Sequence, residues 1–267
     1  MSLSWNCQSG SVHKDIIVHV KAAEKPKQYA TCVIDVVVIL GKFEGNFKSE
    51  IITNGGNTNL KINECDTELD RQIEKCVRTM SCTDKCQLTI TFFESVVKFT
   101  IELISFTSEV DVFELTLEQK LELAKLHKFK GVELFKIGRD LDSFLRFSKA
   151  VKLLITVLDK ENEDVKQLYI TVCNNMSWCH LKKGHLTESL TLSNKVLGIC
   201  PNNVKALLRR ADVYDKLDDL ESAANDLRQV IKLETANKIA RDKLIIIEHK
   251  LRVENTKYIN VVKKMFR

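Results

Sequence analysis

Three basic residues and one amide stand at related positions in the second half of the sequence and could together bind a carboxylate. Lys205 and Arg209 are four residues apart, so a helix would place both on one face. Asn175 and Lys128 occupy the matching places in two earlier helical segments. Ammonium, guanidinium and amide groups donate hydrogen bonds to carboxylate oxygens, and the bonds that involve a charge are the stronger ones. We therefore expect these four side chains to bind the acidic carboxyl terminus of a peptide.

No comparable set of residues for catalysis or metal binding is found in the sequence. The phosphate-binding pattern G-x-x-x-x-G-K, the dinucleotide pattern G-x-G-x-x-G and the nucleophile pattern G-x-S-x-G are all missing. The nine cysteines are expected to be free thiols. Cys76, Cys82 and Cys86 are close in sequence, but no C-x-x-C pair or neighbouring histidine completes a four-ligand site. We predict a protein that is not an enzyme and that holds neither a cofactor nor a metal.

The second half of the sequence has the periodicity of a helical repeat. From Thr116 onward, apolar residues recur with helical spacing, and the segments resemble one another at a period of about 34 residues, typical of tetratricopeptide repeats (TPRs). Small residues recur at matching places in three segments, where they would let paired helices approach closely: Gly131, Gly138, Ser143 and Ala150; Ser177, Gly184 and Ser189; Ala211 and Ala223. Gly138 and Gly184 are farther apart than one repeat, which predicts an extended helix or a loop within residues 159–166.

The last residues predict a helix that closes this array. Ala240, Leu244, Ile247 and Leu251 have helical spacing within residues 235–267. Because a repeat array leaves an apolar face bare at its open end, a terminal helix is expected to cover it. The second half is therefore predicted to be an all-α superhelix, with three TPRs in residues 116–234 and a C-terminal capping helix in residues 235–267.

The first half of the sequence predicts mostly β-structure. Short β-branched apolar runs bounded by turns occupy residues 15–20, 31–40, 87–93 and 96–106. Residues 68–79 carry apolar side chains at the spacing of one short helix. Gly41, Gly45 and the Gly55-Gly56 pair predict turns. We predict an antiparallel sheet wrapped on a short helix in residues 1–112, and an α+β fold for the chain.

The four polar groove residues resemble the carboxylate clamp of TPR co-chaperones, which bind the Glu-Glu-Val-Asp tail of heat-shock protein 90. That clamp has five positions. Lys128, Asn175, Lys205 and Arg209 carry the expected residue types at four of them. Val132 occupies the fifth, where the best-known clamps have Asn and some large immunophilins have Thr. The resemblance implies binding to an acidic C-terminal peptide, with one hydrogen-bond donor missing.

Both halves also resemble the large immunophilins. Residues 220–232 (LESAANDLRQVIK) and 207–212 (LLRRAD) are similar to their TPR region, and residues 32–49 (CVIDVVVILGKFEGNFKS) and 60–91 are similar to their FKBP domain. The resemblance places a degenerate prolyl isomerase pocket at Val36, Phe47, Lys48, Asp70, Ile73 and Phe99. At these positions Ile73 stands where the family has the Trp that forms the pocket floor, and Val36 stands where it has a Tyr. Lys48 replaces the Asp of the family pocket, and Asp70 replaces an Ile. This implies neither isomerase activity nor binding of a tacrolimus-like ligand.

The two resemblances cover nearly the whole chain and identify it as a member of the FKBP-like/TPR immunophilins whose isomerase domain is degenerate. They imply a non-catalytic adaptor for protein–protein interaction, similar to a member that partners a casein kinase 1 family enzyme and modulates its activity in the circadian clock. An alternative is a heat-shock protein 90 co-chaperone that uses the carboxylate clamp. An active prolyl isomerase is the function that these residues support least.

Composition and charge argue against two other classes of partner. The apolar content of 44% and charged content of 29% are typical of a globular protein. Residues 33–40 form the longest apolar run, which Asp35 interrupts and which is far shorter than the roughly 18 residues of a membrane span. We expect no membrane contact, and a cytoplasmic protein with the nucleus as a second location. The net charge of +5 is mild, and the basic C-terminal residues lack interleaved stacking aromatics, so no nucleic-acid partner is predicted.

Overall fold

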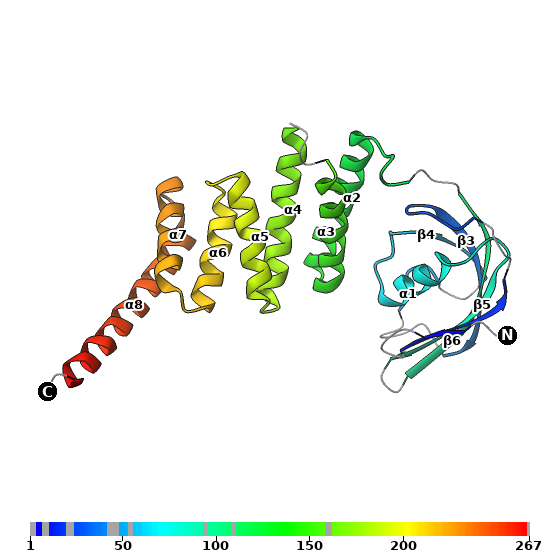
Figure 1. The fold of residues 1–267 in the computed structure, drawn as a ribbon, viewed down its shortest axis with the longest axis horizontal. Coiled ribbons are helices and arrows are strands. Elements are labelled where there is room, and N and C mark those ends of the chain that lie inside the picture. The colour runs from blue at the N-terminus through cyan, green and yellow to red at the C-terminus, as the bar shows by residue number, and fades with distance from the viewer. Residues whose placement is uncertain are drawn as a thin grey trace. The chain divides into compact units, whose positions relative to one another are not determined.

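The chain divides into two compact units, Met1–Leu115 and Thr116–Arg267. A computed structural model describes residues 4–6, 11–19, 24–41, 48–52, 56–92, 95–107, 111–157 and 162–265. The first unit is an antiparallel sheet with one helix, and the second unit is built of helices (Figure 1). These elements confirm the predicted α+β class.

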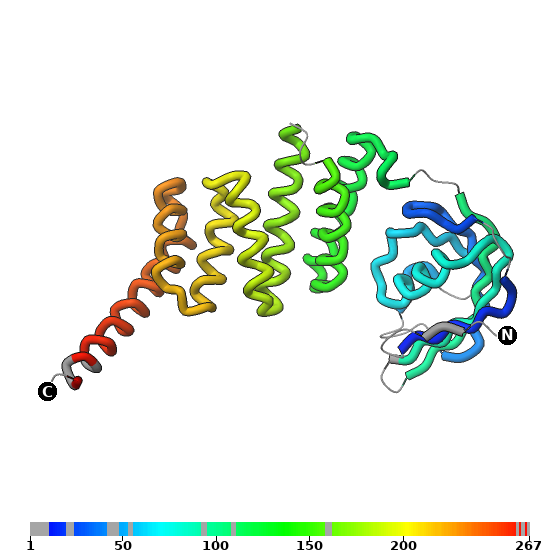
Figure 2. Tube along the Cα trace, in the orientation of Figure 1, coloured from blue at the N-terminus to red at the C-terminus, as the bar shows by residue number. Residues whose placement is uncertain are grey.

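Six strands form one antiparallel sheet within the described part of the first unit. They are β1 (Ser4–Asn6), β2 (Val12–Val18), β3 (Thr31–Leu40), β4 (Gly56–Lys61), β5 (Lys85–Phe92) and β6 (Ser95–Phe106). Their order across the sheet is β1-β2-β5-β6-β3-β4. Figure 2 traces the path of the chain by residue number. Leu88 lies opposite Phe99, and Val36 lies opposite Ile101. Cross-strand pairs of this kind stabilise a sheet, and these four side chains are buried.

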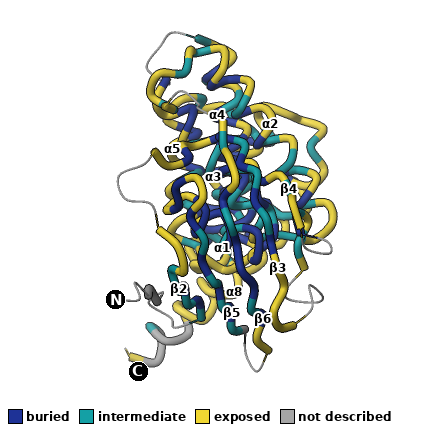
Figure 3. Tube along the Cα trace, turned by 90° about the vertical axis from the view of Figure 1, so that its right-hand side faces the viewer, coloured by how far each residue is buried: buried dark blue, intermediate teal, exposed yellow. Residues whose placement is uncertain are grey.

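One helix, α1 (Glu68–Val77), lies in the hollow of the curved sheet (Figure 1). It begins after Thr67, whose side-chain oxygen accepts a hydrogen bond from the backbone N–H of Asp70 at 3.1 Å. Leu69, Ile73 and Val77 are buried in a single core with the inward residues of the strands. Figure 3 shows the buried residues along β3, β5 and β6 around this helix.

The structure corrects several predicted elements of the first unit. Strands β1 and β4 were not predicted, because β1 is very short and β4 (GNTNLK) lacks β-branched apolar alternation, with Leu60 its one buried residue. Gly56 begins β4 instead of serving only as a turn. Strand β2 begins at Val12, before the predicted start at residue 15, and α1 ends at Val77. Gly45 and Gly55 lie outside the described residues.

Six helices of the second unit stand side by side in three consecutive pairs (Figure 1). The pairs are α2 (Leu117–Lys136) with α3 (Asp140–Ile155), α4 (Glu163–Lys182) with α5 (Leu186–Ile199), and α6 (Val204–Lys216) with α7 (Leu220–Leu233). A last helix, α8 (Lys238–Met265), packs against α7. Among the helices that the structure describes, none is both long and apolar enough to cross a membrane.

Local sequence signals explain where these helices start and turn. Thr116 and Gln119 form a reciprocal capping box at the start of α2, which satisfies backbone N–H groups that a helix start leaves free. The turn inside each pair carries one residue with positive φ: Gly138 at 80°, Gly184 at 79° and Asp218 at 57°. Glycine adopts this conformation without steric cost, and aspartate is among the other residues that tolerate it.

Small residues allow the paired helices to pack closely, as the sequence predicted. A Cβ atom added to Gly131 would lie 2.6 Å from Cε1 of Phe147, so only glycine fits there without a shift. The Ser143 hydroxyl donates a hydrogen bond to the carbonyl oxygen of Gly131 at 2.7 Å. In the second pair, the hydroxyls of Ser177 and Ser189 lie 3.0 Å apart.

Two predicted features of the array need correction. Residues 163–166, which were assigned to an extended helix or loop of the first repeat, belong instead to α4, whose N-cap is Asn162. Residues 158–161 lie outside the described part of the chain. Helix α8 begins at Lys238, where Ala240 and Ile247 are buried, but its described residues beyond Leu251 are largely exposed. Only the first part of α8 therefore covers the end of the array.

Candidate peptide-binding site

The first helices of the three pairs, α2, α4 and α6, carry the predicted groove residues. Helix α4 contacts both α2 and α6, so the three helices lie side by side. A pocket of about 140 Å³ opens between them. Its lining combines apolar, amide and basic side chains: Val132, Phe135 and Lys136 from α2, Phe147 from α3, Asn175 and Trp178 from α4, and Arg209 from α6. Two of the four predicted donors, Asn175 and Arg209, thus share one pocket with Val132.

Arg209 has the most informative environment in this pocket. Its guanidinium carbon lies 3.9 Å from the centre of the Trp178 ring, which is the distance of a cation–π contact. Its Nε atom is buried and has no hydrogen-bond partner. Burial lowers the pKa of the Arg209 guanidinium from its usual value, while the nearby Asp212 carboxylate acts in the opposite direction. A half-buried cation is therefore held in place by a ring and lacks a full set of acceptors.

The neighbouring Arg210 shows how a fully partnered arginine looks in the same helix. Its Nε and Nη2 atoms donate to the two carboxylate oxygens of Asp226 at 2.8 and 2.7 Å, and its Nη1 atom donates to Asn194 at 2.9 Å. This bidentate pair raises the pKa of Arg210. Arg210 is a structural link between α6, α7 and α5, whereas Arg209 faces the pocket.

The other two predicted donors lie one helical turn away from the pocket. Lys128 precedes Val132 by one turn of α2 and is half-buried, and Lys205 precedes Arg209 by one turn of α6 and is exposed. Neither forms a hydrogen bond or an ion pair with a residue that the structure describes. Neither lines the pocket itself. Two of the four predicted donors therefore line the pocket, and the other two stand one helical turn from a pocket residue of the same helix.

Aromatic residues of the pocket were missed as functional residues. Trp178 was not among the predicted site residues, yet its ring lies against the Arg209 guanidinium. Phe135 and Phe147 add apolar walls. A helix periodicity cannot distinguish a packing aromatic from a groove aromatic on the same helix. The usable signal was the position of Trp178 three residues after Asn175, which places both on neighbouring parts of one helix face.

The residues of the predicted degenerate isomerase pocket have structural roles in the first unit. Val36, Ile73 and Phe99 are fully buried in the core around α1. Asp70 is also buried, and it accepts hydrogen bonds from the Ser49 hydroxyl and from the Glu50 backbone N–H, the second at 2.9 Å. Lys48 is exposed, and Phe47 lies outside the described residues.

Family comparisons match most of the first unit and part of the second. A family described as "BDBT FKBP like N-terminal" matches residues 5–108, and the tetratricopeptide repeat family matches residues 204–237. The chain joins an FKBP-like domain to a TPR region. This FKBP-like/TPR chain therefore contains both of the domain types that its sequence predicts.

Known relatives of the FKBP-like/TPR chain are named as FK506-binding proteins. It is 32% identical to FK506-binding protein 59 of Drosophila melanogaster over 170 residues, which cover 64% of this chain and 38% of that protein. It is 28% identical to FK506-binding protein-like of Rattus norvegicus over 267 residues, which cover 98% of this chain and 73% of that protein. The chain thus spans well under half the length of the Drosophila relative.

A solved structure has a similar fold. The crystal structure of residues 1–211 of CG17282 superposes with a TM-score of 0.59 at 21% sequence identity, covering 69% of this chain and 95% of that one. At this identity the likeness concerns the fold alone.

Proposed function

We propose that the protein is a non-catalytic adaptor whose TPR groove binds the acidic carboxyl terminus of a partner protein. The observation that carries this proposal is Arg209, a half-buried guanidinium stacked on Trp178 with an unsatisfied Nε–H. A carboxylate would supply the acceptors that this group lacks. Asn175 lines the same pocket and would donate its amide hydrogens to the same ligand.

The energetics favour an anionic ligand at this place. Burying a charged group without its hydrogen bonds is unfavourable, and a ligand that completes those bonds recovers this loss. A hydrogen bond to a charged group contributes about 1.5–3 kcal/mol. Lys128 and Lys205 have no described acidic partner, so both are available to the acidic side chains upstream of a peptide terminus. Because the Val132 side chain supplies no hydrogen bond, we expect the dissociation constant of the peptide to be micromolar instead of nanomolar.

The heat-shock protein 90 tail is the first peptide to test. A fluorescently labelled peptide ending in Glu-Glu-Val-Asp is titrated with the full chain, in parallel with the same peptide amidated at its carboxyl terminus. Binding should be saturable for the free acid and much weaker for the amide, because amidation removes the α-carboxylate. Equal binding of both peptides, or of neither, would show that the groove is not a carboxylate clamp.

The FKBP-like domain is proposed to act as a binding surface without isomerase activity. Of the positions that the resemblance places in a proline pocket, Val36, Ile73 and Phe99 are core residues here, and the Asp70 carboxylate accepts a hydrogen bond from Ser49. An isomerase of this type holds the proline ring against an aromatic floor, and Ile73 provides none.

A kinase partner is a second candidate, favoured by the family match of the first domain. The matching family carries the initials BDBT in its description. The chain resembles Bride of doubletime, an insect partner of a casein kinase 1 family enzyme in the circadian clock. We propose that the FKBP-like domain binds such a kinase.

Calorimetry of the full chain with a casein kinase 1 catalytic domain tests this second candidate. Wild type and Arg209→Ala should bind the kinase equally, since the groove is not involved. An absence of heat at the highest soluble kinase concentration would reject the kinase proposal and leave the peptide proposal intact.

A further inference from the structure

A second cavity, of about 520 Å³, lies in the FKBP-like domain and is separate from the degenerate isomerase pocket. Its walls come from β2, from the C-terminal half of α1 and the turn after it, and from β5. None of the described isomerase-pocket positions, Val36, Lys48, Asp70, Ile73 or Phe99, lines it. A mostly apolar cavity of this size is ordinarily a place where something binds.

Three sulfur atoms from separate elements meet at the wall of this cavity. Cys76 belongs to α1, Met80 to the turn that follows it, and Cys86 to β5. The Sγ atoms of Cys76 and Cys86 are 3.3 Å apart, and the Sδ atom of Met80 lies 4.0 Å from the first and 3.7 Å from the second. The three residues are 5%, 1% and 1% exposed, in the order Cys76, Met80 and Cys86.

The size of this triangle fits a metal ion coordinated by three sulfurs. A point equidistant from the three atoms lies about 2.1 Å from each, close to the roughly 2.3 Å of a zinc–thiolate bond. Thiolate and thioether donors are soft, and they select Cu(I) among the common ions. Zn²⁺ instead takes four ligands in structural sites, and no cluster of three His, Cys, Asp or Glu residues is found in the described part of the chain.

We propose that Cys76, Met80 and Cys86 bind one Cu(I) ion at the wall of this cavity. Binding converts the two thiols to thiolates, forms three metal–sulfur bonds and releases two protons to solvent, with no change in oxidation state. The bound ion and its two thiolates carry a net charge of −1.

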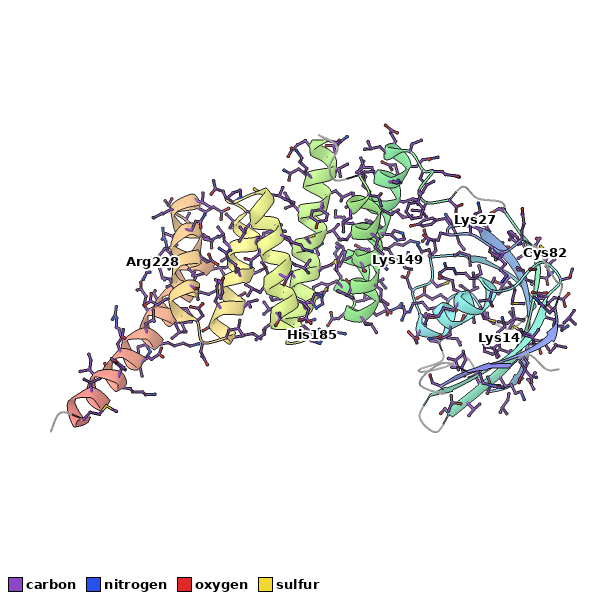
Figure 4. The ribbon with its side chains drawn as sticks, viewed as in Figure 1. Lys14, Lys27, Cys82, Lys149, His185 and Arg228 are labelled. Carbon is purple, nitrogen blue, oxygen red and sulfur yellow. The ribbon has the colours of Figure 1, made fainter. Side chains whose placement is uncertain are left out.

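Lys14 supports a net negative site at this position. It lines the same cavity and is 8% exposed (labelled in Figure 4). Its Nζ atom donates to the neutral Thr79 hydroxyl at 2.7 Å, and it forms no ion pair with a described carboxylate. A buried ammonium without a carboxylate partner is stabilised by a nearby anion, and the copper-bound thiolates would provide one.

The prediction of no metal site rested only on the spacing of cysteine and histidine residues. Cys76 and Cys86 are ten positions apart and belong to no C-x-x-C pair. The spacing of cysteine and histidine also takes no account of methionine ligands, and it does not show that the turn after α1 brings Cys86 of β5 next to Cys76.

Competition for Cu(I) in solution tests the proposal on the full, reduced chain without oxygen. The protein is titrated against a chromophoric Cu(I) chelator, and copper X-ray absorption identifies the donor atoms. We expect one tightly bound Cu(I) per chain, surrounded by sulfur only. Because losing even an outer-shell partner lowers metal affinity about 10- to 100-fold, Cys76→Ser and Cys86→Ser should each weaken binding at least about 100-fold.

Two further variants separate the site from folding and from adventitious thiols. Met80→Leu keeps the side-chain volume and should fold, but it should still lose affinity. Cys82→Ser removes an exposed cysteine of the same domain and should bind like wild type. Circular dichroism confirms that each variant is folded.

Four results would overturn the proposal. The first is a wild-type chain that fails to take Cu(I) from the chelator. The second is a loss of binding in Cys82→Ser equal to that in Cys76→Ser. The third is unchanged affinity in a folded Met80→Leu. The fourth is the presence of nitrogen or oxygen neighbours in the absorption spectrum.

Discussion

The predicted isomerase-pocket positions and the proposed peptide-binding pocket use their polar residues in opposite ways. In the first, Asp70 is buried and accepts hydrogen bonds from Ser49 and Glu50, so its carboxylate is satisfied within the domain. In the second, Arg209 is partly buried and keeps an unsatisfied Nε–H beside Asn175. A polar group that the fold satisfies contributes to stability, and one that the fold leaves unsatisfied is available to a ligand.

The same contrast exists within one helix of the TPR region. Arg209 and Arg210 are adjacent in α6, yet within the described part of the chain only Arg210 donates hydrogen bonds to a carboxylate. Residue type and charge are therefore poor guides to function here. The number of acceptors that surround each guanidinium is the better guide.

The largest effect should follow from removing the Asp70 carboxylate, which accepts its hydrogen bonds from within the domain. Asp70→Ala removes the carboxylate that accepts from the Ser49 hydroxyl and the Glu50 N–H, and a hydrogen bond to a charged group contributes about 1.5–3 kcal/mol. We expect a loss of about 3 kcal/mol in the unfolding free energy of the FKBP-like domain. Denaturation, together with faster hydrogen exchange at Glu50, measures it. The exposed Lys48→Ala serves as control, and equal stability of the two variants would refute this role for Asp70.

Arg209→Ala should have the next largest effect. This effect should be on peptide binding and not on stability. Loss of a charge-assisted hydrogen bond, about 1.5–3 kcal/mol, corresponds to a peptide affinity that is roughly 10- to 150-fold lower. The melting temperature should stay that of wild type, because Arg209 satisfies no other described group by a hydrogen bond. Fluorescence anisotropy with the acidic peptide measures the change.

Arg210→Ala is the matched control for that variant. It leaves the buried Asp226 carboxylate without its partner, so we expect it to destabilise the TPR region by about 2 kcal/mol. Peptide affinity of the folded protein should be unchanged. If the two arginine variants exchanged these effects, the distinction between satisfied and unsatisfied groups would be wrong.

A smaller change is expected from restoring the missing donor. Val132 lines the pocket beside Asn175, and Val132→Asn adds an amide on the same wall. One additional hydrogen bond of about 1.4 kcal/mol would tighten peptide binding roughly tenfold. Val132→Ala, which adds no donor, is the control. Equal affinities of the Asn and Ala variants would show that this position does not contact the peptide.

No effect at all is expected in a prolyl isomerase assay. Ile73 stands at the floor position of the predicted pocket and is buried in the core, so it offers no aromatic ring on which a proline could lie. The rate of cis–trans isomerisation in a proline tetrapeptide should equal the uncatalysed rate at every protein concentration. An active FKBP enzyme serves as the positive control. Catalysis that increases with protein concentration would mean that another surface forms a proline pocket.

The sequence by itself determined the helices, four of the six described strands and their order along the chain. Helical spacing after Thr116, small residues such as Gly131 and the β-branched apolar run of β3 are patterns of residue type within short segments. These signals are local, so they can be recognised without the fold. The types of residue at Lys128, Asn175, Lys205 and Arg209 were also visible, because repeats place equivalent residues at equivalent positions.

Only the tertiary structure decided which of those residues share a pocket and what surrounds them. The stacking of Arg209 on Trp178 joins α6 to α4, and the bonds from Ser49 and Glu50 to Asp70 join a loop to α1. The sulfur triangle likewise joins α1, its following turn and β5. Each depends on how separate elements pack, and hydrogen-bond satisfaction is a property of that packing. Residue spacing therefore predicts where polar groups can lie, and the fold decides which of them remain free to bind.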